Sequence, residues 1–208
     1  MTDNCDIPDA PADATAVEKA DVAVAQAVAP IARTPLVKAL GTLSEVGDQP
    51  QMRVLCAGLV AAGLWRRDAR MTRAGIAMLA AHSVATGMKN FVKNRVDRTR
   101  PTKLVDEGVY DMGEGDSHEH DETSFPSGHT AGAVSAAAAF AHVYPEYRVP
   151  AFAAAGAVSL MQIPRCAHYP SDVGAGALVG IVAGAAVNAA FDAIAGPGAD
   201  RPAEDVEV

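Results

Sequence analysis

The chain has 208 residues, half of them hydrophobic and only 5% aromatic, and this length suits one domain with a sizeable core. The formal net charge is -8, which argues against a nucleic-acid partner because binding to a phosphate backbone requires a basic surface. The three cysteines, Cys5, Cys56 and Cys166, have no paired spacing, so the sequence indicates neither a disulfide framework nor a zinc site.

The N-terminal segment is acidic and rich in proline and alanine, without the basic start and apolar core of a secretory signal. We expect residues 1–20 to be disordered, together with the tail over residues 196–208, and we expect one helical domain over residues 21–195. Residues 20–46 are weakly amphipathic, which favours one or two helices lying on the surface of that domain.

Five apolar stretches follow in the chain. They cover residues 54–65, 74–92, 130–143, 149–163 and 173–191. All are rich in alanine, longer than ordinary strands and poor in β-branched and aromatic residues, so each is expected to be a helix. The sequence therefore predicts an all-α fold, a bundle of about five to six core helices.

The same stretches raise the question of a membrane. A spanning helix needs roughly 20 apolar residues, a length that only residues 173–191 reach cleanly, and the mean hydropathy of +0.10 leaves a soluble bundle as the alternative. Four arginines between the first two stretches favour a cytoplasmic position for that loop. They are Arg66, Arg67, Arg70 and Arg73. Counting crossings from there puts residues 93–129 and 164–172 outside, so we favour a multi-pass protein of the bacterial cytoplasmic membrane whose site faces the periplasm or exterior.

Polar residues that suit phosphate chemistry lie in those two outer loops. They are Lys93, Arg100, Ser127, Gly128, His129, Arg165, His168 and Asp172. Helix ends on one side of a bundle converge, so we expect these residues to form one pocket. Lys93 and Arg100 offer fixed positive charges to phosphate oxygens. Ser127 is expected to cap a helix whose first amides, at Gly128 and His129, would cradle an anion.

Two histidines are expected to divide the catalytic work. Pro170 favours a helix start that makes Tyr169 the cap and Asp172 the third helical residue, aimed back at His168. His168 would then attack phosphorus, while His129 protonates the leaving oxygen and later activates water. Because the fixed cations supply positive charge, we expect no metal and no cofactor.

Three motifs in this order resemble the type 2 phosphatidic acid phosphatases, a family that shares its fold and site with vanadium haloperoxidases and bacterial nonspecific acid phosphatases. Lys93 to Arg100-Pro101 and Pro126-Ser127-Gly128-His129 match two motifs completely, and His168 to Asp172 matches the end of the third. The resemblance covers about residues 50–195. In the third motif the family's Ser-Arg falls on Met161-Gln162, and we expect Arg165, one helical turn further on, to replace the missing arginine.

The resemblance implies a metal-independent phosphatase that forms a phosphohistidine on His168 and hydrolyses a phosphorylated lipid or a small phosphomonoester. Phosphatidic acid, phosphatidylglycerol phosphate and undecaprenyl pyrophosphate are the lipids it suggests. A haloperoxidase with vanadate on His168 is one alternative, and a phosphate-binding membrane protein with a degenerate site, suggested by Gln162, is another. The charged loop over residues 113–123 is interpreted as flexible and substrate-selecting rather than as a metal site. The metal alternative would use Asp116, His118, His120 and Asp121.

Overall fold

The computed structural model describes residues 7–195, and these residues form an all-α fold with one small hairpin. The helices are α1 (Ala16–Ala32), α2 (Pro35–Ser44), α3 (Gln49–Arg66), α4 (Ala69–Lys93), α5 (Pro101–Glu107), α6 (Gly128–Val143), α7 (Arg148–Met161) and α8 (Pro170–Ala195). Two short antiparallel strands, β1 (Val96–Arg98) and β2 (Met112–Glu114), lie between α4 and α6. The prediction of an all-α bundle is confirmed, and each of the five apolar stretches lies within or largely within one of the long helices.

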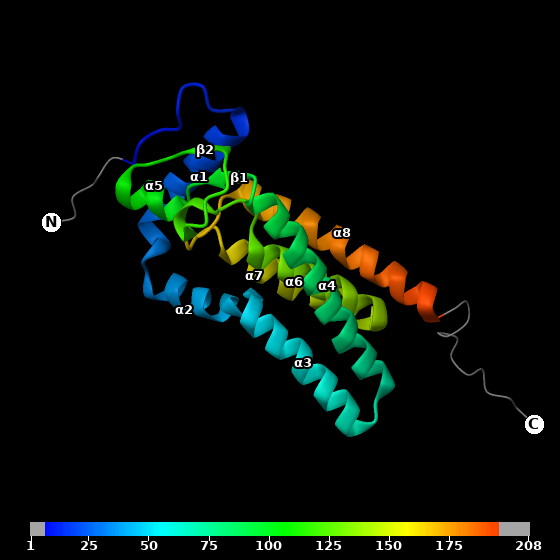
Figure 1. Cartoon of the computed structure of the whole chain (residues 1–208). Helices are drawn as coiled ribbons and strands as arrows, with labels where there is room; N and C mark the ends of the chain where they lie inside the picture. Colours follow the sequence, from blue (N-terminus) through cyan, green and yellow to red (C-terminus); the bar gives the residue numbers. More distant parts are fainter. Residues whose placement is uncertain (1–6, 196–208) are drawn as a thin grey trace, which may run out of the picture.

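The long helices α4, α7 and α8 pack around α6, and α3 packs mainly on α4 (Figure 1). Most residues of α6 are buried, and nearly all of those are alanine, glycine or serine. Such small side chains let neighbouring backbones approach on every side, so α6 is surrounded by α4, α7 and α8. The main core cluster lies here, between Met52 and Cys56 on α3, Met78 on α4 and Val187 on α8.

A stripe of glycines brings α8 close to α6. Gly176, Gly180 and Gly184 recur every four residues and therefore share one face of the helix. A methyl group at Gly180 would lie only 2.8 Å from the carbonyl oxygen of Ala131, so no larger residue fits without movement. This close approach aligns the first turns of the two helices, which are the turns that carry the polar motifs.

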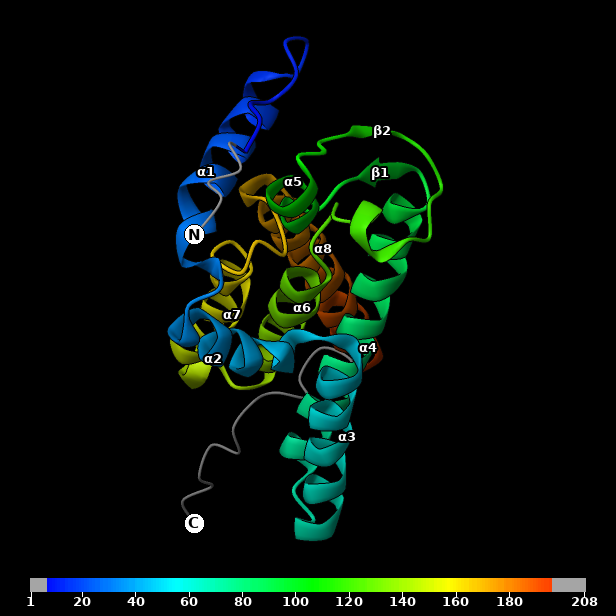
Figure 2. The same ribbon diagram turned by 90° about the vertical axis from the view of Figure 1, so that its left-hand side faces the viewer.

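The arginines of the α3–α4 turn and the phosphate motifs lie at opposite ends of the bundle. Arg70 donates to the carbonyl oxygen of Val143 at 2.9 Å, pairs with Glu146 at 2.8 Å and lies 4.1 Å above the ring of Tyr144. These contacts join the α3–α4 turn to the α6–α7 turn at one end. The hairpin, α5 and the turn before α8 lie at the opposite end (Figures 1 and 2). The loops that carry the arginines and the loops that carry the phosphate motifs therefore lie at opposite ends of the bundle (Figures 1 and 2).

The N-terminal helix α1 begins earlier than expected and is not merely a surface helix. Thr15 and Glu18 form a reciprocal capping box that starts the helix at Ala16, inside the segment 1–20 for which disorder was expected. Val22 and Ala25 are buried against Leu104 and Tyr169. Residues 1–6 and 196–208, the rest of the expected disordered segments, lie outside the described residues.

One described helix segment, Pro170–Ile194, is long and apolar enough to cross a membrane. Large apolar side chains are also exposed on several helices. They include Val54, Leu64 and Trp65 on α3, Val149 and Leu160 on α7, and Leu178, Ile181 and Val182 on α8. Contiguous exposed apolar surface is typical of contact with a membrane or with another protein.

Candidate active site

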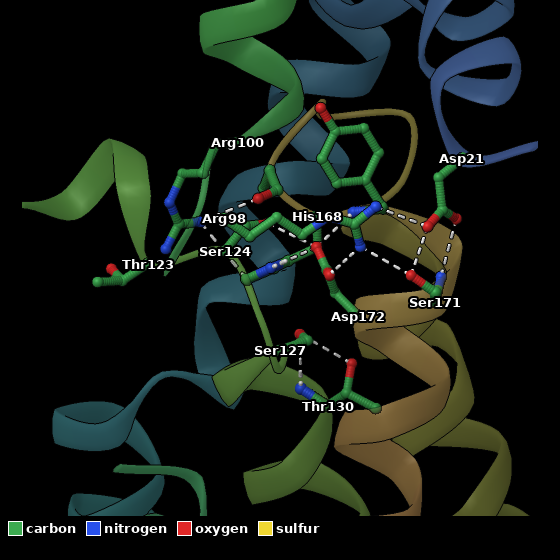
Figure 3. A network of polar contacts seen from close by, with 12 residues as sticks. Asp21, Arg98, Arg100, Thr123, Ser124, Ser127, Thr130, His168, Ser171 and Asp172 are labelled. Atoms are coloured by element: carbon green, nitrogen blue, oxygen red, sulfur yellow. Dashed lines mark hydrogen bonds and ion pairs between the residues drawn. The ribbon is translucent and has the colours of Figure 1, made fainter. Parts of the chain in front are cut away.

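The loops that carry the three motifs meet at one end of the bundle (Figure 3). The amide of Ser127 donates to the carbonyl oxygen of Asp172 at 3.0 Å, which joins the start of α6 to the start of α8. The amide of Thr102 donates to the carbonyl oxygen of Cys166 at 3.0 Å, which joins the first motif to the turn before α8. The predicted convergence of the loops is thus present in the backbone itself.

His168 is buried at the centre of this convergence, with 2% of its surface exposed. Its Nδ1 lies 3.7 Å from Oδ2 of Asp172, and its Nε2 lies 3.5 Å from Nη1 of Arg100. Burial is the main cause that lowers the pKa of His168 to about 4, with Arg100 acting in the same direction and Asp172 against both. At neutral pH the imidazole is therefore uncharged, and it faces a carboxylate on one side and a guanidinium on the other.

Asp172 reaches back to the start of its own helix, as the capping pattern predicts. Its Oδ2 accepts a hydrogen bond from the amide of Tyr169 at 2.8 Å and another from the hydroxyl of Ser124 at 2.5 Å. These bonds fix the carboxylate beside His168. The separation of 3.7 Å from Nδ1 exceeds a hydrogen bond, a looseness common in ligand-free catalytic sites.

Arg100 is fixed by backbone carbonyls on both sides. Its Nε donates to the carbonyl oxygen of His120 at 2.7 Å, and its Nη1 donates to that of Ala167 at 2.9 Å. The planar guanidinium is thereby held in one orientation next to Nε2 of His168. Lys93, the last residue of α4, donates from Nζ to the carbonyl oxygen of Thr123. Both cations of the first motif therefore donate to backbone carbonyls of the loop that leads into α6.

A second lysine of α4, missed in the sequence, points at the start of α6. Lys89 is 9% exposed, and its Nζ lies 3.5 Å from the position that a Cβ at Gly128 would occupy. Glycine at 128 thus leaves room for this cation. None of the ion pairs found over residues 7–195 includes Lys89. The signal available was its spacing of four from Lys93, which places both amines on one face of the helix.

Ser127 and His129 lie at the start of α6 as predicted. The hydroxyl of Ser127 accepts a hydrogen bond from the amide of Thr130 at 3.4 Å, and α6 begins at Gly128. The rings of His129 and His168 lie edge to face, with centroids 6.4 Å apart and an angle of 61° between their planes. On its other side, Nε2 of His129 lies 3.5 Å from Oε2 of Glu45, a residue that the sequence did not single out.

Arg165 does not bond into the pocket as we expected. Its guanidinium pairs with Glu45 and donates to the hydroxyl of Ser44 at 3.0 Å and to the carbonyl oxygen of Gly41 at 3.3 Å. Gln162, at the position of the family's arginine, is buried and donates to the hydroxyl of Ser44 at 3.2 Å. The C-terminal end of α2 and Glu45 offer Arg165 counter-charge at closer range, because a partly buried guanidinium requires a partner.

Two further charged residues complete the network around Asp172. Arg98 is 1% exposed and donates from Nη1 to Oδ1 of Asp172 at 2.7 Å, and from Nη2 to Oδ2 of Asp21 at 2.8 Å. In the sequence Arg98 lies between Lys93 and Arg100 of the first motif, and Asp21 lies 77 positions before it. No local pattern links the two, so this pair could not be found without the fold.

Within residues 7–195 no group of three histidine, cysteine or acidic side chains lies close enough together to hold a metal ion. The charged loop over residues 113–123 instead packs on the first motif. The amide of Arg100 donates to the carbonyl oxygen of Asp121 at 2.8 Å, and the amide of Ser117 donates to Asp97 at 2.9 Å. The loop is thus part of the wall around Arg100.

More than half of the chain, over residues 71–194, matches the profile of a known family, the PAP2 superfamily. The chain belongs to this superfamily. The match includes every motif residue from Lys93 to Asp172 and excludes Asp21 and Glu45. The resemblance to type 2 phosphatidic acid phosphatases is therefore confirmed.

Two curated relatives are lipid A 1-phosphatases from Rhizobium johnstonii and Rhizobium etli. Each is 38% identical to this PAP2 chain over 93 residues, which is 45% of the chain. The matched region spans 38% and 40% of the two relatives, respectively, so it represents about two fifths of their length.

Two solved structures share the fold. One is a transmembrane PAP2 type phosphatidylglycerolphosphate phosphatase from Bacillus subtilis, with a TM-score of 0.64, 21% identity and coverage of 88% of this chain and 89% of that one. The other is LpxE from Aquifex aeolicus, with a TM-score of 0.54, 22% identity and coverage of 84% and 96%. At these identities the likeness establishes the fold alone, a bundle that covers most of the present chain.

Proposed function

We propose that this PAP2 protein is a metal-independent phosphatase that acts through a phosphohistidine on His168. The observation that carries the proposal is the setting of that imidazole. It is uncharged and buried, with Nδ1 towards Asp172, Nε2 towards Arg100 and the ring of His129 opposite at 6.4 Å. A nucleophile, an orienting carboxylate, a phosphate-binding cation and an acid are thus gathered around one space.

In the first step the lone pair on Nε2 of His168 forms a bond to phosphorus as the bond from phosphorus to the leaving oxygen breaks. His129 gives its proton to that oxygen. In the second step His129 takes a proton from water, the water oxygen bonds to phosphorus, and the phosphorus–nitrogen bond breaks. The lone pair returns to His168, and phosphate leaves.

The negative charge on the transferring group is stabilised by fixed donors. Lys93, Arg100 and the free amides at Gly128 and His129 surround the phosphoryl oxygens, and Lys89 adds a further cation beneath Gly128. The charge of Arg165 is balanced by its ion pair with Glu45, which lies beside His129. In this proposal Lys89 takes the place of the family's third arginine.

The substrate we propose is a phosphorylated lipid. The relatives are lipid A phosphatases, and a structural neighbour acts on phosphatidylglycerolphosphate. The exposed apolar faces of α3, α7 and α8 support a multi-pass position in a bacterial membrane. The arginines of the α3–α4 turn favour a cytoplasmic location for that end, which leaves the His168 end at the periplasmic or outer surface.

The test is phosphate release by the detergent-solubilised protein in the presence of EDTA. The substrates are p-nitrophenyl phosphate, phosphatidic acid and a lipid A 1-phosphate. Wild type is compared with His168→Ala and with the control His142→Ala, whose histidine pairs with Asp192 at the opposite end of the bundle. We expect turnover in wild type and control and none in His168→Ala. Turnover that survives in His168→Ala contradicts the proposal, and so does a wild type that turns over none of the three substrates.

A further inference from the structure

A carboxylate on the N-terminal helix contacts the same groups that hold the nucleophile's partner. Asp21 on α1 is 3% exposed, and it lies outside the region that matches the superfamily. Its Oδ1 accepts a hydrogen bond from the amide of Ser171 at 3.1 Å, and its Oδ2 accepts one from Nη2 of Arg98 at 2.8 Å. The hydroxyl of Ser171 also donates to Oδ2 (Figure 3).

Arg98 joins this carboxylate to Asp172. Its two terminal nitrogens divide their bonds, with Nη2 on Asp21 at 2.8 Å and Nη1 on Asp172 at 2.7 Å. Nη1 also donates to the hydroxyl of Ser171 at 2.7 Å, and the guanidinium lies 4.2 Å above the ring of Tyr169. One buried guanidinium is therefore held between two buried carboxylates, and its orientation depends on both.

The charges explain why the second carboxylate matters. Two carboxylates and one guanidinium leave a net charge of -1 in a network that water does not reach. That charge lies beside Nδ1 of His168, where it favours a proton on Nδ1 and a free lone pair on Nε2. Without Asp21, Arg98 would neutralise Asp172 completely and could turn both nitrogens on it. Oδ2 of Asp172 would stay on the Tyr169 amide and the Ser124 hydroxyl, but its neutralised charge would favour the proton on Nδ1 of His168 less.

We propose that Asp21 is a positioning residue, which acts through Arg98 to preserve the negative charge of Asp172 beside Nδ1 of His168 and makes α1 a part of the catalytic unit. The effect on turnover rests on the proposed phosphatase function. A role in docking α1 alone would not need this arrangement. The apolar contacts of Val22 and Ala25 and the exposed ion pair between Arg33 and Asp106 already attach the helix.

The experiment compares Asp21→Asn with the control Asp106→Asn in the full-length protein in detergent. The control removes a carboxylate that also attaches α1 to the rest of the chain. Its partner, Arg33, is not among the residues bonded to Arg98, Asp172 or His168. We expect Asp21→Asn to lower kcat about 10–100-fold, the range found when the outer partner of a metal-bound histidine is removed, with KM changed less than about 3-fold. Asp106→Asn should keep wild-type kcat.

A second measurement reads His168 without turnover. Nitrogen-15 spectra of histidine-labelled protein, assigned with His168→Gln, report which ring nitrogen carries the proton. We expect the Nδ1-protonated form alone in wild type and in Asp106→Asn, and a mixture of both forms in Asp21→Asn. An unchanged tautomer in Asp21→Asn, or a kcat no lower than that of Asp106→Asn, overturns the proposal.

A third variant covers the case in which Asp21→Asn does not fold, because it leaves Arg98 with one carboxylate. Ser171→Ala removes the hydroxyl shared by Asp21 and Arg98 and leaves every charge paired. It should lower kcat about 3–10-fold, the loss of roughly one hydrogen bond, and should admit some of the second tautomer. No change in either quantity refutes the coupling. A wild type without turnover would refute the phosphatase function, while the tautomers would still decide the role of Asp21.

Discussion

The division of labour between the two histidines makes a quantitative prediction for His129→Asn. The two rings are 6.4 Å apart, centroid to centroid, and in the proposed mechanism the leaving oxygen lies on the His129 side. A general acid contributes about 10²–10⁴-fold, or roughly 3–5 kcal/mol of barrier, when the leaving group needs a proton. An alkyl phosphate such as phosphatidic acid has such a leaving group, whereas p-nitrophenolate departs readily without one.

The assay is a rapid-mixing measurement of the first turnover, before water attack becomes limiting. We expect His129→Asn to slow the first turnover of phosphatidic acid about 10²–10⁴-fold and that of p-nitrophenyl phosphate less than about 10-fold. A burst of p-nitrophenol followed by a slow phase should appear, because the variant hydrolyses the phosphohistidine slowly. His142→Asn serves as the control. An equal loss for both substrates would refute the assignment of His129 as the acid.

Two further predictions concern the nucleophile and the unexpected lysine. Burial lowers the pKa of His168 to about 4, so its free lone pair is lost only when pH falls through that value. The kcat/KM for p-nitrophenyl phosphate should therefore be independent of pH near neutrality and fall tenfold per pH unit below about 4. An acid limb near 6.5, the ordinary value for histidine, would contradict the buried, uncharged state. Lys89→Met should weaken competitive inhibition by inorganic phosphate roughly 10–100-fold, the contribution of one hydrogen bond to a charged group. The control Lys38→Met, which changes an exposed lysine, should leave the inhibition constant unchanged. Equal inhibition constants for the two variants would show that Lys89 does not bind phosphate.

Local patterns in the sequence were sufficient for the long helices and for the ends that carry the motifs. The capping positions of Ser127 and Asp172 depend on contacts three residues away, which any helix with that sequence can make. The alanine-rich composition predicted close helix packing for a similar reason, since small side chains let two helix backbones approach closely at any position. The short elements β1, β2 and α5 were not predicted, because three to seven residues are too few to show a period.

The partners of the charged residues were decided only by the tertiary structure. Asp21 and Arg98 are 77 positions apart, and Glu45 and Arg165 are 120 apart, so no spacing in the sequence joins either pair. Arg165 was predicted to face phosphate because it lies one helical turn after Gln162, the position of the family's arginine. In the fold Glu45 is closer, and an ion pair at short range outweighs the pattern. The sequence by itself therefore determined the long helices and the motifs that place the chain in its superfamily, whereas the fold decided which carboxylate each buried cation binds, because that choice depends on distances between segments remote in the chain.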